Sequence, residues 1–284
     1  MKAGSAHYAL GSAIARLLPR GWVGPPAEGL ARFYGRCSAA DAAAVSDNLK
    51  AALPGATAAD VRRLTSEVFA RFSAYLVDLF YSRQEGFALF ERRLRCEGLD
   101  HLDRAMARGH GVVVVSAHLG HWERAGMALA RLGYPIKALA VRHRDPAVEG
   151  FFDERRRHHG LGIIHLDGSL RECYRHLGSG GVLGVNADRL YGEGGVPVRF
   201  LDRTVRFPQG PARIAARCDA PVVTAFMTME AQDRLCLRIG EELPGHDTAA
   251  TTEAFARRFE RMVREHPTQW FLFQRYWEAP QWPD

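Results

Sequence analysis

His118 and Glu123 are the two residues whose types and spacing best suit catalysis. They lie in the stretch Ser116-Ala117-His118-Leu119-Gly120-His121-Trp122-Glu123, directly after four valines at 112–115. An apolar run that stops at small residues predicts a buried strand, and the Trp-Glu pair predicts the start of a helix. With 12 histidines and 32 acidic residues, about one His-x-x-x-x-acid spacing arises by chance. The strand-turn-helix context is what singles this one out, because catalytic groups gather at strand ends.

The chemistry expected of this pair is general base catalysis. Glu123 fixes the tautomer of His118 and raises its basicity, and the other ring nitrogen deprotonates a substrate hydroxyl or amine. Ser116 is a candidate nucleophile only if its hydroxyl reaches His118, and no G-x-S-x-G elbow surrounds it. Direct transfer from a preformed thioester therefore suits these residues better than a covalent acyl-enzyme. Replacing His118 or Glu123 by alanine is expected to abolish transfer and to leave the fold intact.

Three other interpretations of the same residues stay open. A hydrogen-bonded core histidine explains the local pattern around His118 equally well. A thioesterase or metal-dependent hydrolase could use His118, His121 and Glu123, although the H-E-x-x-H arrangement is missing and no metal site is predicted. In that case His121 would be a ligand, whereas otherwise it lines the pocket or caps the helix. A non-catalytic lipid or carrier-protein binding module is favoured if His118 and Glu123 lie too far apart to hydrogen-bond.

Further candidate residues follow later in the chain. Asp188 and Arg189 end a second apolar run, so they are expected at the same sheet edge as His118. Gly210 lies in a turn that leads into a helix, whose N-terminal amides could face an anion such as phosphate. The segment 151–160 is rich in arginine, including Arg156, and is either the solvated end of a helix or a clamp for phosphate groups.

The elements that must position these residues change in character along the chain. Residues 8–18 carry an apolar stripe that ends at Pro19-Arg20-Gly21-Trp22. This stripe predicts either an amphipathic helix in a membrane interface, with Arg16, Arg20 and Trp22 at headgroup level, or a helix packed on the main domain. From residue 39 to about 81 the pattern is helical, broken at Pro54-Gly55.

After Gly98 short β-branched runs alternate with helical segments. Strands are predicted near 112–116, 136–141, 162–166, 182–186, 221–228 and 234–239, and helices near 101–107, 121–131, 146–158, 169–177, 210–217 and 249–265. This alternation predicts an α/β fold with a mostly parallel central sheet flanked by helices. Residues 1–97 are expected to form a helical layer packed on the core, and residues 98–284 the α/β core.

Composition limits the classes of partner and compartment. The chain has 284 residues, 47% hydrophobic and 25% charged, as in an ordinary globular protein. The formal charge of +6 favours an acidic carrier, surface or ligand, and no nucleic-acid recognition module is recognisable. The five isolated cysteines suit reduced thiols in the cytoplasm. No apolar run predicts a membrane span or a signal peptide.

The ordered set of motifs resembles the late acyltransferases of lipid A biosynthesis, the lauroyl/myristoyl family, and the related mycobacterial phosphatidylinositol mannoside acyltransferases. The resemblance spans nearly the whole chain. It rests on Asn48-Leu49, His118 to Glu123 (an H-x4-E motif), an arginine near 156, Asp188-Arg189, residues 200–210 and His266-Pro267-Thr268-Gln269-Trp270-Phe271.

This resemblance implies a glycerolipid-acyltransferase-like fold and a reaction. His118 would be the general base and Glu123 its orienter, with an acyl chain moving from an acyl carrier protein or coenzyme A thioester to a lipid or glycolipid hydroxyl or amine. No cofactor is implied beyond that thioester co-substrate. Substrate-binding positions implied or expected around the pair are Gly120, His121, Trp122, Arg156, Asp188, Arg189 and Gly210. Backbone amides near Gly120 or Gly210 could stabilise an oxyanion.

Three departures from the family pattern bear on the acceptor. Relatives commonly carry an N-terminal membrane helix, where this chain shows only the short stripe from Tyr8 to Leu18. His121 stands where many relatives have Asn, and Asp188-Arg189 replaces a commoner Asp-Gln pair. We therefore expect peripheral attachment at the cytoplasmic face of the membrane, with a small lipid or carrier-bound acceptor in place of lipid A.

Overall fold

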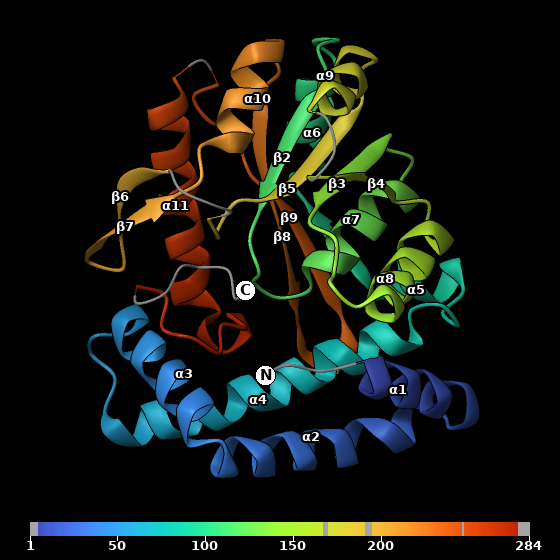
Figure 1. The fold of residues 1–284 in the computed structure, drawn as a ribbon, viewed down its shortest axis with the longest axis vertical. Coiled ribbons are helices and arrows are strands. Elements are labelled where there is room, and N and C mark those ends of the chain that lie inside the picture. The colour runs from blue at the N-terminus through green and yellow to red at the C-terminus, as the bar shows by residue number, and fades with distance from the viewer. Residues whose placement is uncertain (1–4, 167–169, 191–194, 246, 278–284) are drawn as a thin grey trace. The chain divides into compact units, whose positions relative to one another are not determined.

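A computed structural model describes residues 5–166, 170–190, 195–245 and 247–277 of the chain (Figure 1). Their contacts group them into two compact units. The helical unit contains the residues up to Gly86, the segment 143–155 and the residues from Arg261 onward, and the sheet unit contains residues 87–142 and 156–260. The expected division after residue 97 stays a prediction, because contact grouping alone does not define a folding domain.

A seven-stranded sheet with both faces covered forms the centre of the sheet unit. Its strand order is β1-β9-β8-β2-β5-β3-β4, and every neighbouring pair is parallel except β8 and β9. This confirms the predicted α/β class with a mostly parallel sheet. The strands are β1 Leu94–Glu97, β2 Val112–Ser116, β3 Ile136–Ala140, β4 Gly162–His165, β5 Val182–Asn186, β8 Val222–Met229 and β9 Leu235–Ile239.

Helices connect the strands by crossovers that run in both directions along the sheet. The β2–α7–β3 crossover runs toward the β4 edge and the β5–α10–β8 crossover runs the other way, so right-handed connections place α7 and α10 on opposite faces. Burial on both faces explains the unbroken apolar run of β2, all five residues of which are buried. The helices from α5 onward are α5 Phe87–Arg93, α6 Leu99–Met106, α7 Trp122–Arg131, α8 Pro146–His158, α9 Arg171–Gly178, α10 Gly210–Cys218 and α11 Thr248–Glu265, with the short η1 Ala231–Asp233.

The predicted core strands and helices are confirmed, with ends that differ by a residue or two; position 169, where one helix was expected to begin, lies outside the described residues. The hairpin of β6 (Val196–Phe200) and β7 (Arg203–Phe207) was not predicted. Its turn residues Leu201 and Asp202 have φ of 50° and 61°, and leucine gives no sequence signal for that conformation. The turn is held because the Leu201 amide donates to the Glu260 carboxylate at 2.8 Å.

The helical unit is built around the long helix α4. Its helices are α1 Ser5–Leu17, α2 Arg20–Cys37, α3 Ala39–Ala52 and α4 Ala58–Tyr81, with the short η2 Pro267–Gln269 near the C-terminus. Helix α4 starts with a capping box between Thr57 and Asp60, which satisfies two otherwise unpaired amides. Across all the described residues, no helix has both the length and the hydropathy needed to cross a bilayer.

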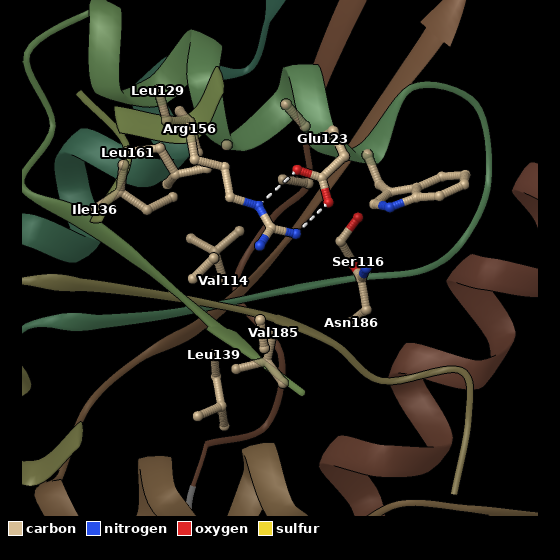
Figure 2. Close-up of a pocket in the computed structure, with 17 residues that line it drawn as sticks. Val114, Ser116, Glu123, Leu129, Ile136, Leu139, Arg156, Leu161, Val185 and Asn186 are labelled. Carbon is tan, nitrogen blue, oxygen red and sulfur yellow. Dashed lines mark hydrogen bonds and ion pairs between the residues drawn. The ribbon is translucent and has the colours of Figure 1, made fainter. Parts of the chain in front are cut away.

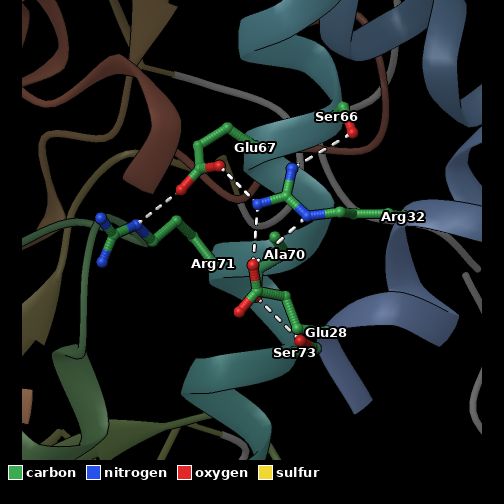
Figure 3. A network of polar contacts seen from close by, with 7 residues as sticks. All are labelled: Glu28, Arg32, Ser66, Glu67, Ala70, Arg71 and Ser73. Carbon is green, nitrogen blue, oxygen red and sulfur yellow. Dashed lines mark hydrogen bonds and ion pairs between the residues drawn. The ribbon is translucent and has the colours of Figure 1, made fainter. Parts of the chain in front are cut away.

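The predicted end of the first helix before Pro19 is confirmed, since α1 ends at Leu17, but the helix α2 that follows from Arg20 was not predicted. Pro19 takes the N-cap position of α2, and the helix continues through two internal prolines. It is joined to α4 by a polar network around Arg32, which binds Glu28 at 2.7 Å and Glu67 at 2.8 Å (Figure 3). The expected apolar stripe of residues 8–18 is also split, because Tyr8 packs against Phe80 and aromatic residues of α8 and not beside Leu10.

Two of the family-like motifs have structural roles within the helical unit. The buried Asn48 side chain donates to the carbonyl oxygens of Leu272 and Gln274 and accepts from the Tyr276 amide. The ring of Phe271, at the end of the closing motif, packs against Phe72. These contacts tie the C-terminal segment to the helices, since a buried amide side chain needs partners for its donors and its acceptor.

Candidate active site

The candidate site lies at the carboxyl ends of β2 and β5, which are neighbours in the sheet. Ser116 pairs with Asn186 in the parallel register, and the Ala187 amide donates to the Ser116 carbonyl oxygen at 2.8 Å. His118 and Asp188 each lie two residues beyond this last paired position. The sheet register therefore brings together two side chains that are 70 residues apart in the sequence.

His118 and Asp188 form a hydrogen-bonded pair. The His118 ring Nδ1 lies 2.9 Å from Asp188 Oδ1, and the His118 backbone amide donates to Oδ2 at 3.1 Å. The His118 side chain keeps 16% of its surface exposed, whereas the Asp188 side chain keeps only 3%. A carboxylate at Nδ1 selects the tautomer that carries its proton there. The other nitrogen, Nε2, makes no hydrogen bond to any described residue and is left to accept a proton.

The surroundings of Asp188 keep it ionised. Burial raises the pKa of Asp188, but the charge and hydrogen bond of His118, the charge of Arg189 and the His118 amide together outweigh it. The pKa of Asp188 therefore lies below its ordinary value of 3.8. An ionised carboxylate at neutral pH can both orient the imidazole and stabilise the imidazolium that forms when the ring accepts a proton.

The expected hydrogen bond between Glu123 and His118 is not formed, because the His118 ring binds Asp188. Glu123 instead forms a two-pronged ion pair with Arg156, with Oε2 at 2.9 Å from Nε and Oε1 at 2.7 Å from Nη2 (Figure 2). Both side chains are more than nine-tenths buried. The physical reason is that β5 delivers a carboxylate directly to Nδ1, while Glu123, at the start of α7, points toward the end of α8. Asp188 thus takes the orienting role expected of Glu123.

The missing bond between His118 and Glu123 was the observation expected to favour a non-catalytic binding module. It does not favour that module here, because the carboxylate of Asp188 binds the His118 ring instead. The condition for Ser116 as nucleophile, a hydroxyl that reaches His118, is not met. Its hydroxyl is buried and makes no hydrogen bond to a described residue, and the His118 ring bonds only to Asp188.

Gly120 fixes the turn between β2 and α7. Its φ is +62°, and a Cβ added there would lie 2.0 Å from the Met227 carbonyl oxygen, so no larger residue fits. The His121 amide donates to that same oxygen at 2.7 Å. That amide, one of the donors expected near Gly120 for an oxyanion, is therefore already in use.

His121 and Trp122 have different roles from each other. The His121 side chain is fully buried, makes no capping hydrogen bond at the start of α7 and is not among the cavity-lining residues. The expected capping role of its side chain is thus wrong, whereas its role in substrate binding stays a prediction. Within the described residues, His118, His121 and Glu123 do not bring their ligand atoms together around one point. Trp122 packs edge-on to the His118 ring at 5.0 Å between centroids.

A cavity of about 90 Å³ lies between α7 and the sheet, and Trp122 is one of the residues that line it. Its floor consists of small residues on three strands: Ala138 and Ala140 on β3, Gly184 on β5 and Ala225 on β8. Apolar side chains such as Leu129, Ile136 and Leu161 line it, and Ser116, Trp122 and the Glu123–Arg156 pair form a polar end (Figure 2). The small floor residues are the reason that space remains in an otherwise close-packed layer.

The remaining predicted site residues form no hydrogen bond with the His118 ring. Arg189 follows Asp188, is half-buried and acts on it through its charge. Gly210, at the start of α10, is exposed and does not line the cavity, so the expected anion site at that helix end is not part of it. The phosphate clamp that was one interpretation of the arginine-rich segment stays a prediction, although two of its arginines are buried and bound to protein groups. Arg156 pairs with Glu123, and Arg155 donates to the Leu79 carbonyl oxygen within the helical unit.

Comparison with known proteins gives the family. The model of the bacterial lipid A biosynthesis acyltransferases matches residues 3–279. This chain belongs to that family. The resemblance predicted from the sequence is thereby confirmed.

Individual members that the chain resembles include two phosphatidylinositol mannoside acyltransferases. The protein of Mycobacterium tuberculosis is 30% identical over 187 residues, which cover 64% of this chain and 59% of that protein. The protein of Mycolicibacterium smegmatis is 29% identical over 187 residues, which cover 64% of this chain and 61% of that protein. The matched part of this chain thus spans about three fifths of the length of these relatives.

Proposed function

We propose that this family member is an acyltransferase that moves a fatty acyl chain from a thioester to a hydroxyl or amine of a lipid or glycolipid at the membrane surface. The observation that carries the proposal is His118, held by the ionised Asp188 and in ring contact with Trp122, which lines an apolar cavity. The names of the relatives, phosphatidylinositol mannoside acyltransferases, support the same reaction class.

The proposed step needs no covalent enzyme intermediate. Nε2 of His118 takes the proton from the acceptor hydroxyl as its oxygen bonds to the thioester carbonyl carbon. The tetrahedral intermediate collapses by breaking the carbon–sulfur bond, and the leaving thiolate takes the proton back from the imidazolium. Asp188 stays ionised and stabilises the charged ring through this cycle. The metal-free route is consistent with the separate positions of His118, His121 and Glu123.

The apolar cavity is the proposed site for part of the acyl chain. Its walls are aliphatic, and its polar end contains the buried Ser116 hydroxyl and the Glu123–Arg156 pair. An apolar pocket with a few polar groups at one end suits a ligand with a hydrocarbon tail and a polar head. Trp122 lines the cavity and also contacts His118, which links the tail site to the reacting group.

Filling the cavity floor is expected to shorten the preferred acyl chain. In Gly184→Leu the new Cβ would meet Ile136 at an ordinary 3.4 Å, so the side chain extends into the cavity without a backbone clash. Competition between thioesters of different length should then shift toward shorter chains, by roughly tenfold in relative kcat/KM, as a difference of one or two methylenes suggests. The control is Gly150→Leu, where an added Cβ contacts nothing within 4 Å. An unchanged chain preference in Gly184→Leu would place the acyl chain elsewhere.

The donor, compartment and cofactor assignments are part of the same proposal. The donor is an acyl carrier protein or coenzyme A thioester, and no other cofactor takes part. The chain would act at the cytoplasmic face as a peripheral protein. The formal charge of +6 supports an acidic carrier or an anionic surface as partner.

A product assay tests the reaction. The purified chain is mixed with isotope-labelled acyl-coenzyme A or acyl carrier protein and a total lipid extract, and lipids and intact protein are followed by mass spectrometry. We expect labelled lipid, thioester loss that depends on the acceptor, and no labelled protein. Release of free fatty acid without acceptor would indicate a thioesterase, and chelator-sensitive release a metal-dependent one. Bound thioester that is never consumed would indicate a binding module.

A further inference from the structure

Helix α2 exposes its largest apolar side chains. Trp22 is 71% exposed, Leu30 68% and Phe33 61%, and no residue of the helix is buried. At 100° per residue, these three side chains lie within one narrow sector of the helix, together with Pro26. We call these four residues the α2 face. Such a continuous apolar strip is unusual on the surface of a soluble protein and marks an interaction site.

The opposite side of α2 carries small residues and packs on α4. Gly24, Ala27, Ala31 and Gly35 lie there, and all four are half-buried. A Cβ on Gly35 would lie 2.6 Å from the Phe69 ring of α4, so the close approach requires glycine. A helix that only packs on its own protein turns its large apolar side chains inward. Helix α2 has the reverse arrangement.

Polar contacts hold α2 in place in the absence of large buried side chains. Arg32 binds Glu28 of the same helix and Glu67 of α4 (Figure 3), and Arg20 at the helix start binds Asp78 at 2.9 Å. Because these anchors lie outside the α2 face, the exposed side chains are not needed to fix the helix to its neighbour.

The charges of the first two helices indicate the kind of partner. Residues 5–37 contain four arginines and one acidic residue, Glu28. Arg16 and Arg36 are exposed, and Arg36 flanks the α2 face. A tryptophan and other large apolar side chains bordered by arginine suit the interface of an anionic bilayer. A second copy of the chain would present the same positive charges and would be repelled.

We propose that the α2 face binds an anionic lipid bilayer at the boundary between headgroups and acyl chains. This proposal rests on the proposed function and deepens it, since it names the surface by which the enzyme would reach a lipid acceptor. Trp22, Leu30 and Phe33 enter the boundary region, and Arg36 contacts lipid phosphates. The four residues of the α2 face belong to the helical unit, and none of them is a candidate active-site residue.

Vesicle sedimentation with the full chain tests the proposal. The probe is phosphatidylcholine vesicles containing about 30% phosphatidylglycerol, which gives the surface a negative potential, compared with pure phosphatidylcholine. We expect the triple variant Trp22→Ser/Leu30→Ser/Phe33→Ser to partition roughly tenfold or more weakly than wild type. Wild-type binding should weaken on pure phosphatidylcholine. The matched control is Leu89→Ser/Leu132→Ser, two exposed leucines of the sheet unit, which should bind like wild type.

The proposal would be overturned if wild type did not bind the vesicles, or if the triple variant bound them as well as wild type does. It would also be overturned if light scattering showed that wild type is a dimer and the triple variant a monomer, while wild type bound no vesicles. Acyl transfer to detergent-dispersed lipid separates this proposal from the proposed function. The triple variant should keep that activity. If wild type showed no acyl transfer to detergent-dispersed lipid, the proposed function would be contradicted. The vesicle assay would still test membrane binding by the α2 face independently.

Discussion

His118→Gln is expected to lower kcat/KM for acyl transfer by about 10²–10⁴-fold, the usual contribution of a general base. Glutamine can still donate to Asp188 from its amide, so the buried carboxylate keeps a partner and the fold should be retained. The amide cannot accept a proton from the acceptor. The measurement is the initial rate of labelled lipid formation, with the melting temperature as a check on folding.

The control for this variant is His110→Gln. His110 lies in the sheet unit with its side chain 50% exposed and close to Asp219, away from the cavity lining. Transfer by this variant should equal that of wild type. Near-normal transfer by folded His118→Gln would show that no imidazole base is needed at this position.

Breaking the Glu123–Arg156 pair is expected mainly to lower the free energy of unfolding. Removing one partner of a buried ion pair leaves an uncompensated charge and costs about 3–5 kcal/mol. Glu123→Gln and Arg156→Met should each lower the free energy of unfolding by about that amount, measured by urea denaturation. This replaces the sequence-based expectation that Glu123→Ala leaves the fold intact, because both groups are more than nine-tenths buried.

The double variant Glu123→Leu/Arg156→Met separates the structural role from a catalytic one. Removing both charges and keeping the volume is often nearly neutral for stability, so the double variant should recover much of the loss. It should also transfer acyl chains faster than His118→Gln, since Asp188 still holds the base. Full stability in both single variants, or a double variant as inactive as His118→Gln, would contradict the role assigned here to the pair.

The sequence predicted the strands of the site but not their order. The apolar runs before Ser116 and Asn186 predicted two buried strands whose ends carry His118 and Asp188. Local pattern cannot show that β5 lies directly beside β2, because that pairing is set by the packing of the whole sheet. Glu123 is near in sequence and was therefore assigned as the partner of His118, whereas the register selected Asp188. For the same reason, the local pattern did not predict that Arg156 binds Glu123.

Two of the elements that were missed, α2 and the β6–β7 hairpin, share a physical reason. Helix α2 contains two prolines and several glycines, and its small residues face its own protein, so its pattern contradicts the usual rule for helices. The β6–β7 hairpin turns through a leucine at positive φ, which tertiary contacts with Glu260 support. In both cases contacts distant in the sequence outweigh local preference.

The central claim, that Asp188 holds His118 as a base with its proton on Nδ1, is tested most directly by ¹⁵N NMR of the neutral histidine rings. The His118 signals can be assigned by their loss in His118→Gln. We predict a neutral ring protonated at Nδ1 and bare at Nε2 in wild type, and loss of this tautomer preference in Asp188→Asn, because the new amide can donate to Nδ1. A neutral wild-type ring protonated at Nε2, or an unchanged tautomer in Asp188→Asn, would contradict the account.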